Sequence, residues 1–273
     1  MLIIFIMDYN SFLQATTLIL DMKKLVCITG ATSGFGKAIA FKFAGHGDNL
    51  ILTGRRKALL EDLAKELILK YSIEVMPLSF DIRERQEVES AISGLSEKWR
   101  GIDVLVNNAG LAAGLNSVHE GLIDDWERMI DTNVKGLLYM TRMVAPWMVA
   151  RNQGHIINIG SVAGKEVYPM GNVYCGSKFA VDAITKGTRI DLVAHNIKVT
   201  QIAPGAAETE FSLVRFKGDK ERAGNVYKGY QPLKAEDVAE VVYYVTTLPQ
   251  HVNINDLVLM PTAQACATII HKK

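Results

Sequence analysis

Short apolar runs alternate with stretches of helically spaced apolar residues over most of the chain. The apolar runs predict strands at residues 24–29, 49–53, 73–80, 102–108, 154–161, 196–205 and 256–261. Helical spacing predicts helices at 36–45, 57–69, 84–99, 124–149, 172–195 and 235–247. Because the strands are apolar throughout, we expect an α/β fold: a doubly wound parallel sheet with helices on both faces.

Two prolines modify this pattern. Pro77 cannot donate a ladder hydrogen bond, so its strand is expected near an edge or a bulge of the sheet. Pro146 is expected to bend the long helix 124–149. No repeat, linker or low-complexity tract divides the chain, which favours one domain.

The first 21 residues do not follow the alternation. Their apolar run is interrupted by Asp8, Asn10 and Gln14, so it is too short and polar for a spanning helix and lacks a secretory pattern. We therefore expect an N-terminal extension at 1–21 and a folded domain at 22–273. The alternative is an arm that binds a membrane or a partner.

Composition narrows the class of protein. Hydrophobic residues make up 49% and charged residues 22%, as in globular proteins, and the net charge is +1. Charge therefore gives no reason to expect nucleic acid or an anionic membrane as partner. Cys27, Cys175 and Cys266 are far apart and form no CxxC pair, which favours reduced thiols in a cytoplasmic protein without a metal site.

A glycine-rich stretch, TGATSGFG at 29–36, separates the first strand from the first helix. Its glycines permit a sharp turn and close approach of a ligand, and the helix start offers free N–H groups to a pyrophosphate. Ordinary turn chemistry is the alternative. The residues expected to bind a dinucleotide here are Gly30, Thr32, Ser33, Gly34, Phe35 and Gly36.

The end of the second strand indicates which dinucleotide fits. NAD sites usually place an acid there for the ribose 2′-OH, but this chain has Gly54 followed by Arg55 and Arg56. Guanidinium groups bind a 2′-phosphate, so we expect NADP. The alternative is an arginine pair that simply begins a solvated helix.

Further candidates follow the other strands at the carboxyl edge, where ligands bind in this architecture. Asp81 either caps the next helix or contacts the adenine edge. The remaining cofactor candidates are Ile82, Asn108, Ala109, Gly110, Pro204 and Gly205.

Residues 161–180 contain candidate acid–base residues. Ser161 ends a strand, Tyr174 follows thirteen residues later, and Lys178 lies four residues beyond it. Positions i and i+4 share a helix face, so phenol and ammonium can converge on one ligand. Tyr168 lacks a lysine at that offset, whereas Tyr230 has Lys234 but Pro232 between them disfavours a helix.

These groups suit proton transfer to a carbonyl. Action near pH 7 requires a shift of roughly three units from a tyrosine pKa of about 10, or about 4 kcal/mol. We expect Lys178 and an oxidised nicotinamide to lower the pKa of Tyr174, and Ser161 to orient the substrate oxygen. Asn133 is either a satisfied buried amide or an anchor for a water near Lys178.

In this order and spacing, GxxxGxG, NNAG, the mid-helix Asn, the Ser and YxxxK resemble the short-chain dehydrogenase/reductase family over residues 23 to about 261. The resemblance implies a seven-stranded Rossmann sheet, a homotetramer, and a catalytic tetrad of Asn133, Ser161, Tyr174 and Lys178, with Tyr174 and Lys178 also at the cofactor. QGHIINIGS, GNVYCGSK, TEFSLVRFKGD and LPQHVNIN resemble the bacterial NADP-dependent 3-hydroxy acid dehydrogenases, which include serine and allo-threonine dehydrogenases.

The substrate is then expected to be a small 3-hydroxy acid, a 3-oxo acid or a semialdehyde. Arg215, in the polar segment 206–230, could bind its carboxylate bidentately, or could be a solvated residue of a lid. The alternative functions are a reductase of neutral ketones or steroids and a non-catalytic NADPH-binding regulator.

Overall fold

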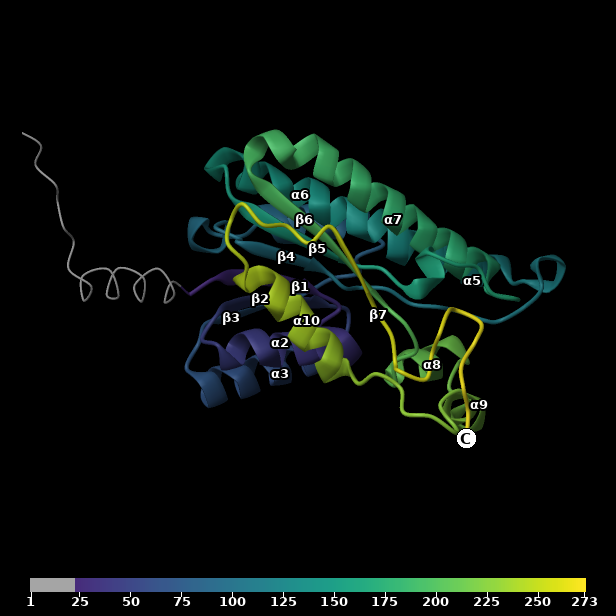
Figure 1. The fold of residues 1–273 in the computed structure, drawn as a ribbon. Coiled ribbons are helices and arrows are strands. Elements are labelled where there is room, and N and C mark those ends of the chain that lie inside the picture. Colours follow the sequence, from purple (N-terminus) through teal and green to yellow (C-terminus); the bar gives the residue numbers. More distant parts are fainter. Residues whose placement is uncertain (1–22) are drawn as a thin grey trace, which may run out of the picture.

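The computed structural model describes residues 23–273, so the expected extension at 1–21 lies outside the described residues. Seven parallel strands form one sheet in the order β3-β2-β1-β4-β5-β6-β7 (Figure 1). The strands are β1 (Leu25–Thr29), β2 (Asn49–Gly54), β3 (Val75–Ser79), β4 (Val104–Asn107), β5 (Gly154–Ile159), β6 (Ile197–Pro204) and β7 (Asp256–Leu259). The prediction of a doubly wound parallel sheet is confirmed.

The strand order reverses at β1. The chain runs outward from β1 through β2 to β3, then returns to pair β4 with the free side of β1. The loops after β1 and β4 therefore leave the sheet in opposite directions. This divergence opens a crevice at the carboxyl ends of the strands, which is the ligand site of open α/β sheets.

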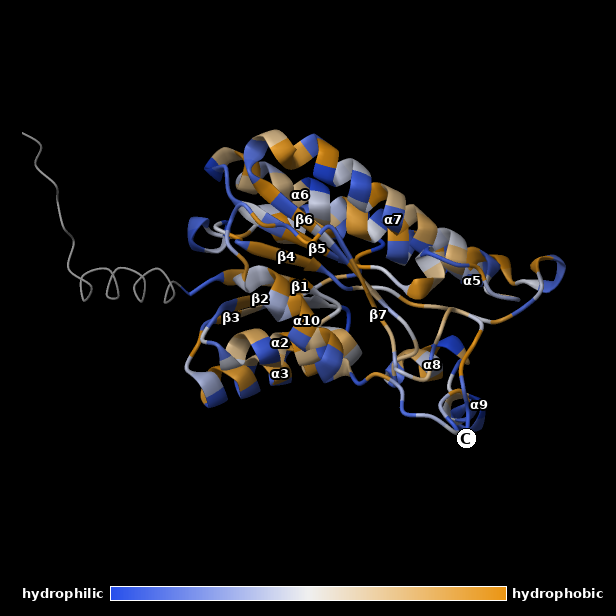
Figure 2. Cartoon of the chain, in the orientation of Figure 1, coloured by the Kyte–Doolittle hydropathy of each residue, from blue (hydrophilic) through white to orange (hydrophobic). Residues whose placement is uncertain are grey.

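Two layers of helices cover the sheet (Figure 1). One layer contains α2 (Gly34–Gly45), α3 (Lys57–Tyr71) and α10 (Ala235–Thr247). The other contains α4 (Arg85–Ser93), α6 (Leu137–Arg151) and α7 (Asn172–Leu192). Successive strand residues alternate between the layers, so Val26 packs with the first and Cys27 with the second. Both faces of a strand must then be apolar, as Figure 2 shows for the central strands.

The proline in β3 stands at the sheet edge. β3 pairs with β2 alone, and Pro77 lies opposite Leu52. An edge strand tolerates a missing N–H on its outer side, so the prediction for this proline is confirmed. β6, by comparison, lies between β5 and β7, and every one of its residues is buried.

The expected long helix 124–149 is not one regular helix. The structure has α5 (Ile123–Ile130), a π-helical turn (Asp131–Gly136) and then α6, which contains Pro146. The break in regular α-helix therefore lies before the proline. Within the π-turn, Asn133 is buried and bonded to a neighbouring loop, a contact that helical periodicity does not reveal.

Two other predicted helices also end early. The helix predicted at 84–99 ends at Ser93, and a short 3₁₀ turn (Glu97–Trp99) follows Gly94. The helix predicted at 172–195 closes with a 3₁₀ turn at Val193–His195. Within residues 23–273, no helix combines the length and apolar character needed to cross a membrane.

The polar segment 206–234 forms two short helices, α8 (Glu210–Arg215) and α9 (Lys220–Asn225). They lie beyond the carboxyl ends of the strands, beside the C-terminal end of the chain (Figure 1). This segment therefore covers the crevice that the strand order opens.

Candidate active site

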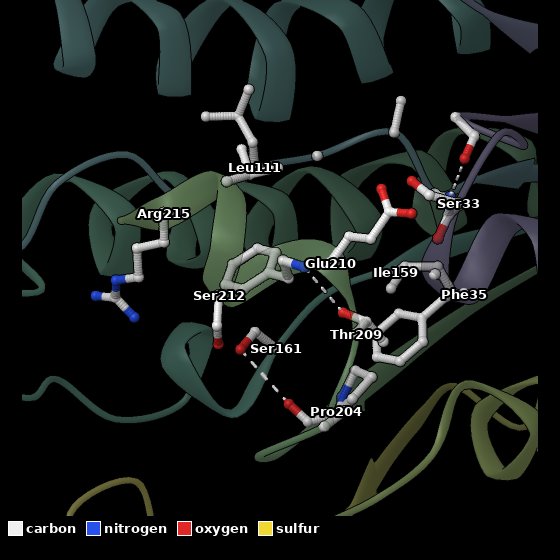
Figure 3. A pocket seen from close by; sticks show the side chains of 18 of the residues that line it. Ser33, Phe35, Leu111, Ile159, Ser161, Pro204, Thr209, Glu210, Ser212 and Arg215 are labelled. Carbon is white, nitrogen blue, oxygen red and sulfur yellow. Dashed lines mark hydrogen bonds between the residues drawn. The ribbon is translucent and has the colours of Figure 1, made fainter. Parts of the chain in front are cut away.

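A cleft of about 640 Å³ lies at the carboxyl ends of the strands. Figure 3 shows it with Ser33 and Phe35 of the glycine loop on one side and Arg215 on the other. Of the site residues expected from the sequence, those that line it are Gly30, Thr32, Ser33, Gly34, Phe35, Arg55, Arg56, Asp81, Ile82, Asn108, Ala109, Gly110, Ser161, Tyr174, Lys178, Pro204, Gly205 and Arg215. The two others, Gly36 and Asn133, lie behind this lining.

The glycine loop fits a phosphate. Gly30 and Gly34 have φ values of +67° and +49°, which disfavour side chains. A Cβ on Gly36 would collide with the Gly30 carbonyl and lie 2.6 Å from the Asn108 amide nitrogen. The first turn of α2 has no acidic side chain and no side-chain cap, so its N–H groups are available to an anion.

Asn108 joins the end of β4 to this loop. Its side-chain amide donates to the carbonyls of Thr29 at 2.8 Å and Gly30 at 3.2 Å. The Thr29 hydroxyl in turn accepts from the backbone N–H groups of Asn108 and Ala109. Asn108 therefore holds the shape of the loop from within.

The two arginines after β2 each face a carboxylate. Arg56 donates to the Thr32 hydroxyl from Nη2 at 2.9 Å, and its Nη1 lies 3.4 Å from Glu210. Arg55 lies 3.5 Å from Asp81. Both guanidinium groups line the cleft at the end of β2, where the sequence predicts a site for the ribose 2′-phosphate.

Asp81 does not cap the next helix. The N-cap of α4 is Glu84, which makes no side-chain cap bond, whereas the Asp81 carboxylate accepts from the backbone and side chain of Arg83. Burial alone would raise the pKa of Asp81, but the Arg83 hydrogen bonds and the charges of Arg55 and Arg83 lower it. The capping alternative is therefore wrong, and Asp81 lines the cleft as a fixed carboxylate.

Ser161, Tyr174 and Lys178 meet at the floor of the cleft. Ser161 follows β5, and its hydroxyl accepts from the Ala163 N–H at 3.1 Å. Tyr174 and Lys178 are buried on α7, and the lysine Nζ donates to the Ile159 carbonyl at 2.9 Å. The ring of Phe211 packs edge-on against Tyr174, with 5.7 Å between centroids.

Burial dominates the ionisation of this pair. It raises the pKa of Tyr174, with a contribution from Tyr168, while a hydrogen bond with Ser161 and the charge of Arg215 oppose the rise. Burial also lowers the pKa of Lys178 to about 8. Lys178 is not among the largest influences on the phenol, so the expected lowering of the Tyr174 pKa by Lys178 is not what the structure shows.

Asn133 is a buried and satisfied amide. It donates to the Leu111 carbonyl and accepts from the Leu111 N–H, both at 2.8 Å, and also donates to the Ser177 hydroxyl. A Cβ on Gly110 would lie 3.2 Å from the side-chain oxygen of Asn133 and 3.5 Å from the Lys178 Nζ. The bonds of Asn133 are therefore those of a satisfied buried amide. Gly110 lies next to both Asn133 and Lys178.

Arg215 lies at the same end of the cleft as Tyr174. It donates from Nη2 to the Tyr168 hydroxyl at 3.0 Å and from Nε to the Gly114 carbonyl at 3.4 Å. Its guanidinium carbon lies 5.4 Å from the ring centre of Tyr168 and 5.8 Å from that of Tyr174. The structure therefore places this half-buried cation beside the two phenols.

Several residues that line the cleft were not predicted from the sequence. They include Phe211 and Tyr227 of the covering segment and Gln264 and Ile270 near the C-terminus. Gln264 accepts from the Ala206 N–H at 2.7 Å, which ties the C-terminal segment to the end of β6. No local pattern marks them, because the path of the folded chain brings them to the cleft. Over residues 23–273, no cluster of His, Cys, Asp and Glu suited to a metal is present.

Comparisons with known proteins agree with this geometry. A family model described as short chain dehydrogenase matches residues 24–219. NADP-dependent 3-hydroxy acid dehydrogenase YdfG of Salmonella typhi is 49% identical over 250 residues, covering 91% of this chain and 99% of that protein. Sulfoacetaldehyde reductase 2 of Chromohalobacter salexigens is 47% identical over 245 residues, covering 89% and 96%. The closed form of serine dehydrogenase complexed with NADP+ superposes with a TM-score of 0.85 at 47% identity, covering 91% and 100%.

Proposed function

The chain belongs to the short-chain dehydrogenase family, and from this premise we propose that it transfers a hydride between NADP and a small 3-hydroxy acid or the matching 3-oxo acid or semialdehyde. Serine, allo-threonine, 3-hydroxypropionate and 3-hydroxyisobutyrate represent the substrate class. One observation carries the proposal: the guanidinium of Arg215 lies 5.8 Å from the ring centre of Tyr174 in the same cleft. A cation at that distance suits a substrate whose carboxylate is close to its reacting carbon.

The chain is an NADP-dependent oxidoreductase that acts on CH–OH groups. Its residues fit that cofactor, because the glycine loop and the open N-terminus of α2 suit the pyrophosphate, and Arg55 and Arg56 suit the 2′-phosphate. When bound, NADP supplies or accepts the hydride. The protein residues have to bind the substrate, orient it and move the proton.

Tyr174 is proposed to exchange that proton. Because its pKa is raised, the phenol stays protonated near neutral pH and can donate to a carbonyl oxygen during reduction. Ser161 orients the same oxygen through its hydroxyl. Lys178, with a pKa of about 8, holds a proton at neutrality and loses it at mildly alkaline pH, which suits a group that reprotonates Tyr174. Asn133 supports this end of the cleft by fixing Leu111.

Arg215 and Tyr168 are proposed to bind the substrate carboxylate together. The Tyr168 hydroxyl accepts from Arg215 and carries a proton of its own that it can donate to an anion. Hydrogen bonds to charged groups contribute roughly 1.5–3 kcal/mol. Arg215→Met should therefore lower kcat/KM for malonic semialdehyde about 10- to 100-fold and leave a neutral ketone nearly unchanged. Arg222→Met, which removes an exposed arginine of the same segment, is the matched control.

The substrate panel separates the alternatives. Equal losses on both substrates in Arg215→Met would exclude the carboxylate anchor. Turnover confined to bulky neutral ketones would favour a ketone or steroid reductase, and tight NADPH binding without turnover would favour a regulator. A sulfonate is also an anion, and the similarity to sulfoacetaldehyde reductase 2 makes sulfoacetaldehyde the second substrate to test.

We also propose that the chain forms a homotetramer and is located in the cytoplasm. A homotetramer is supported by apolar side chains on the outside of α7, where Phe179 and Ile190 are 41% and 73% exposed. Val193, in the turn after that helix, is 70% exposed. A cytoplasmic location is supported by three cysteines that are all unpaired among the described residues.

A further inference from the structure

Arg56, one of the two arginines proposed to bind the 2′-phosphate, already has an anionic partner from the covering segment. Its Nη1 lies 3.4 Å from the carboxylate of Glu210, while Nε and Nη2 donate to the Thr32 hydroxyl at 3.1 and 2.9 Å. Glu210 is the first residue of α8 and directly follows the N-cap Thr209. Figure 3 shows its side chain directed toward the glycine loop at Ser33.

The neighbouring arginine has a different kind of partner. Arg55 faces Asp81, whose side chain is 17% exposed and is held by Arg83 at 2.7 Å. The Glu210 side chain is 56% exposed, and within residues 23–273 its ion pair is with Arg56. Asp81 is therefore fixed in place, whereas Glu210 can leave its arginine when a stronger anion arrives.

We infer that Glu210 competes with the 2′-phosphate of NADP for Arg56 and thereby sets how strongly the chain prefers NADP to NAD. The inference rests on the proposed role of Arg56 in the cofactor site. A phosphate monoester carries about 1.5 to 2 negative charges near neutral pH against one for a carboxylate, so the phosphate displaces Glu210. The displacement breaks an ion pair and leaves two anions near one guanidinium, so the phosphate binds more weakly than it would at an unpaired arginine.

NAD carries no phosphate at this position and does not need to displace Glu210. The carboxylate therefore reduces the affinity for NADP and leaves the affinity for NAD nearly unchanged. Removing its charge should widen the preference for NADP, although the exposure of the pair limits the effect to that of a surface ion pair.

The test uses nucleotide fragments, because α8 also carries Phe211 and Arg215 and substrate kinetics would mix two effects. Calorimetric titration of the full chain with 2′-AMP reports on the phosphate at Arg56, and 5′-AMP serves as the matched ligand. Glu210→Gln should bind 2′-AMP about two- to fivefold more tightly and 5′-AMP unchanged. The gain should disappear in an Arg56→Gln background and shrink in 1 M salt.

The protein control is Glu208→Gln, which removes an exposed carboxylate two residues away. It should alter neither affinity, and thermal unfolding of each variant verifies that it is folded. A gain shared by 5′-AMP, a gain that survives Arg56→Gln, or an equal gain in Glu208→Gln would overturn the inference. If the unaltered chain bound 2′-AMP no better than 5′-AMP, the role of Arg56 itself would fall, and the inference with it.

Discussion

Lys178 should destabilise the folded chain at neutral pH, because it is an ammonium group held out of water. It is 6% exposed, and burial lowers its pKa from 10.5 to about 8. Its bond to the Ile159 carbonyl offsets part of the loss of hydration. Replacement by methionine, a side chain of similar length, removes the charge and should abolish activity.

The sign of the effect follows from proton binding. Below pH 8 the lysine is protonated in both folded and unfolded chains, so the folded chain carries the full penalty of roughly 3 kcal/mol. Between pH 8 and 10.5 the folded chain releases the proton and the unfolded chain keeps it, so stability rises with pH. From pH 7 to pH 9.5 the unaltered chain should gain roughly 2 kcal/mol relative to Lys178→Met.

Urea unfolding of both proteins at pH 7, 8 and 9.5 measures this difference. The carbonyl left unpaired in the variant lowers its stability equally at each pH, so it does not enter the comparison. Lys186→Met, which removes a more exposed ammonium from the same helix, is the control. A difference between Lys178→Met and the unaltered chain that stays constant across these pH values would show that Lys178 carries no such penalty, as would an equal trend in the control.

Two further predictions concern the phenol and a buried imidazole. Tyr174→Phe should lower turnover about 10²- to 10⁴-fold while NADPH binding, followed by fluorescence, changes little; undiminished turnover would exclude the tyrosine as acid. Burial and the charges of Lys198 and Lys24 lower the pKa of His155 to about 3. Below pH 6.5 the unfolded chain therefore binds a proton at this imidazole that the folded chain does not bind, and the folded chain loses stability. Between pH 6.5 and 4.5, the free energy of unfolding measured in urea should fall by roughly 2 to 3 kcal/mol less in His155→Gln than in the unaltered chain. An equal fall in both proteins would contradict this.

The fold was predictable because the sequence patterns that specify it each lie within a few consecutive residues. Strands apolar on both faces, the glycine loop and the polar residues at strand ends each appear in a short window, and parallel strands bring those ends to one edge. The position of Pro77 on an edge strand shows the same logic, since a missing N–H within a strand disfavours a place between two other strands.

The parts that could not be predicted depend on contacts between distant segments. The sequence allows Asp81 to be a helix cap, but in the structure its carboxylate contacts Arg83 and Arg55 instead. Gln264 and Ile270 reach the cleft through the path of the C-terminal segment. The ionisation of Tyr174 depends on its depth in the protein, which spacing on a helix cannot give.

The wide turn at Asp131–Gly136 limits how this protein can be engineered. Deleting one residue to make the rod from α5 to α6 a uniform α-helix would replace the i→i+5 bonds of this turn with i→i+4 bonds and turn its residues about the helix axis. Asn133 would then face away from Leu111, and the loop beside Lys178 would lose both of its amide bonds. Thermostabilising designs should leave these six residues untouched and look for gains elsewhere on the scaffold.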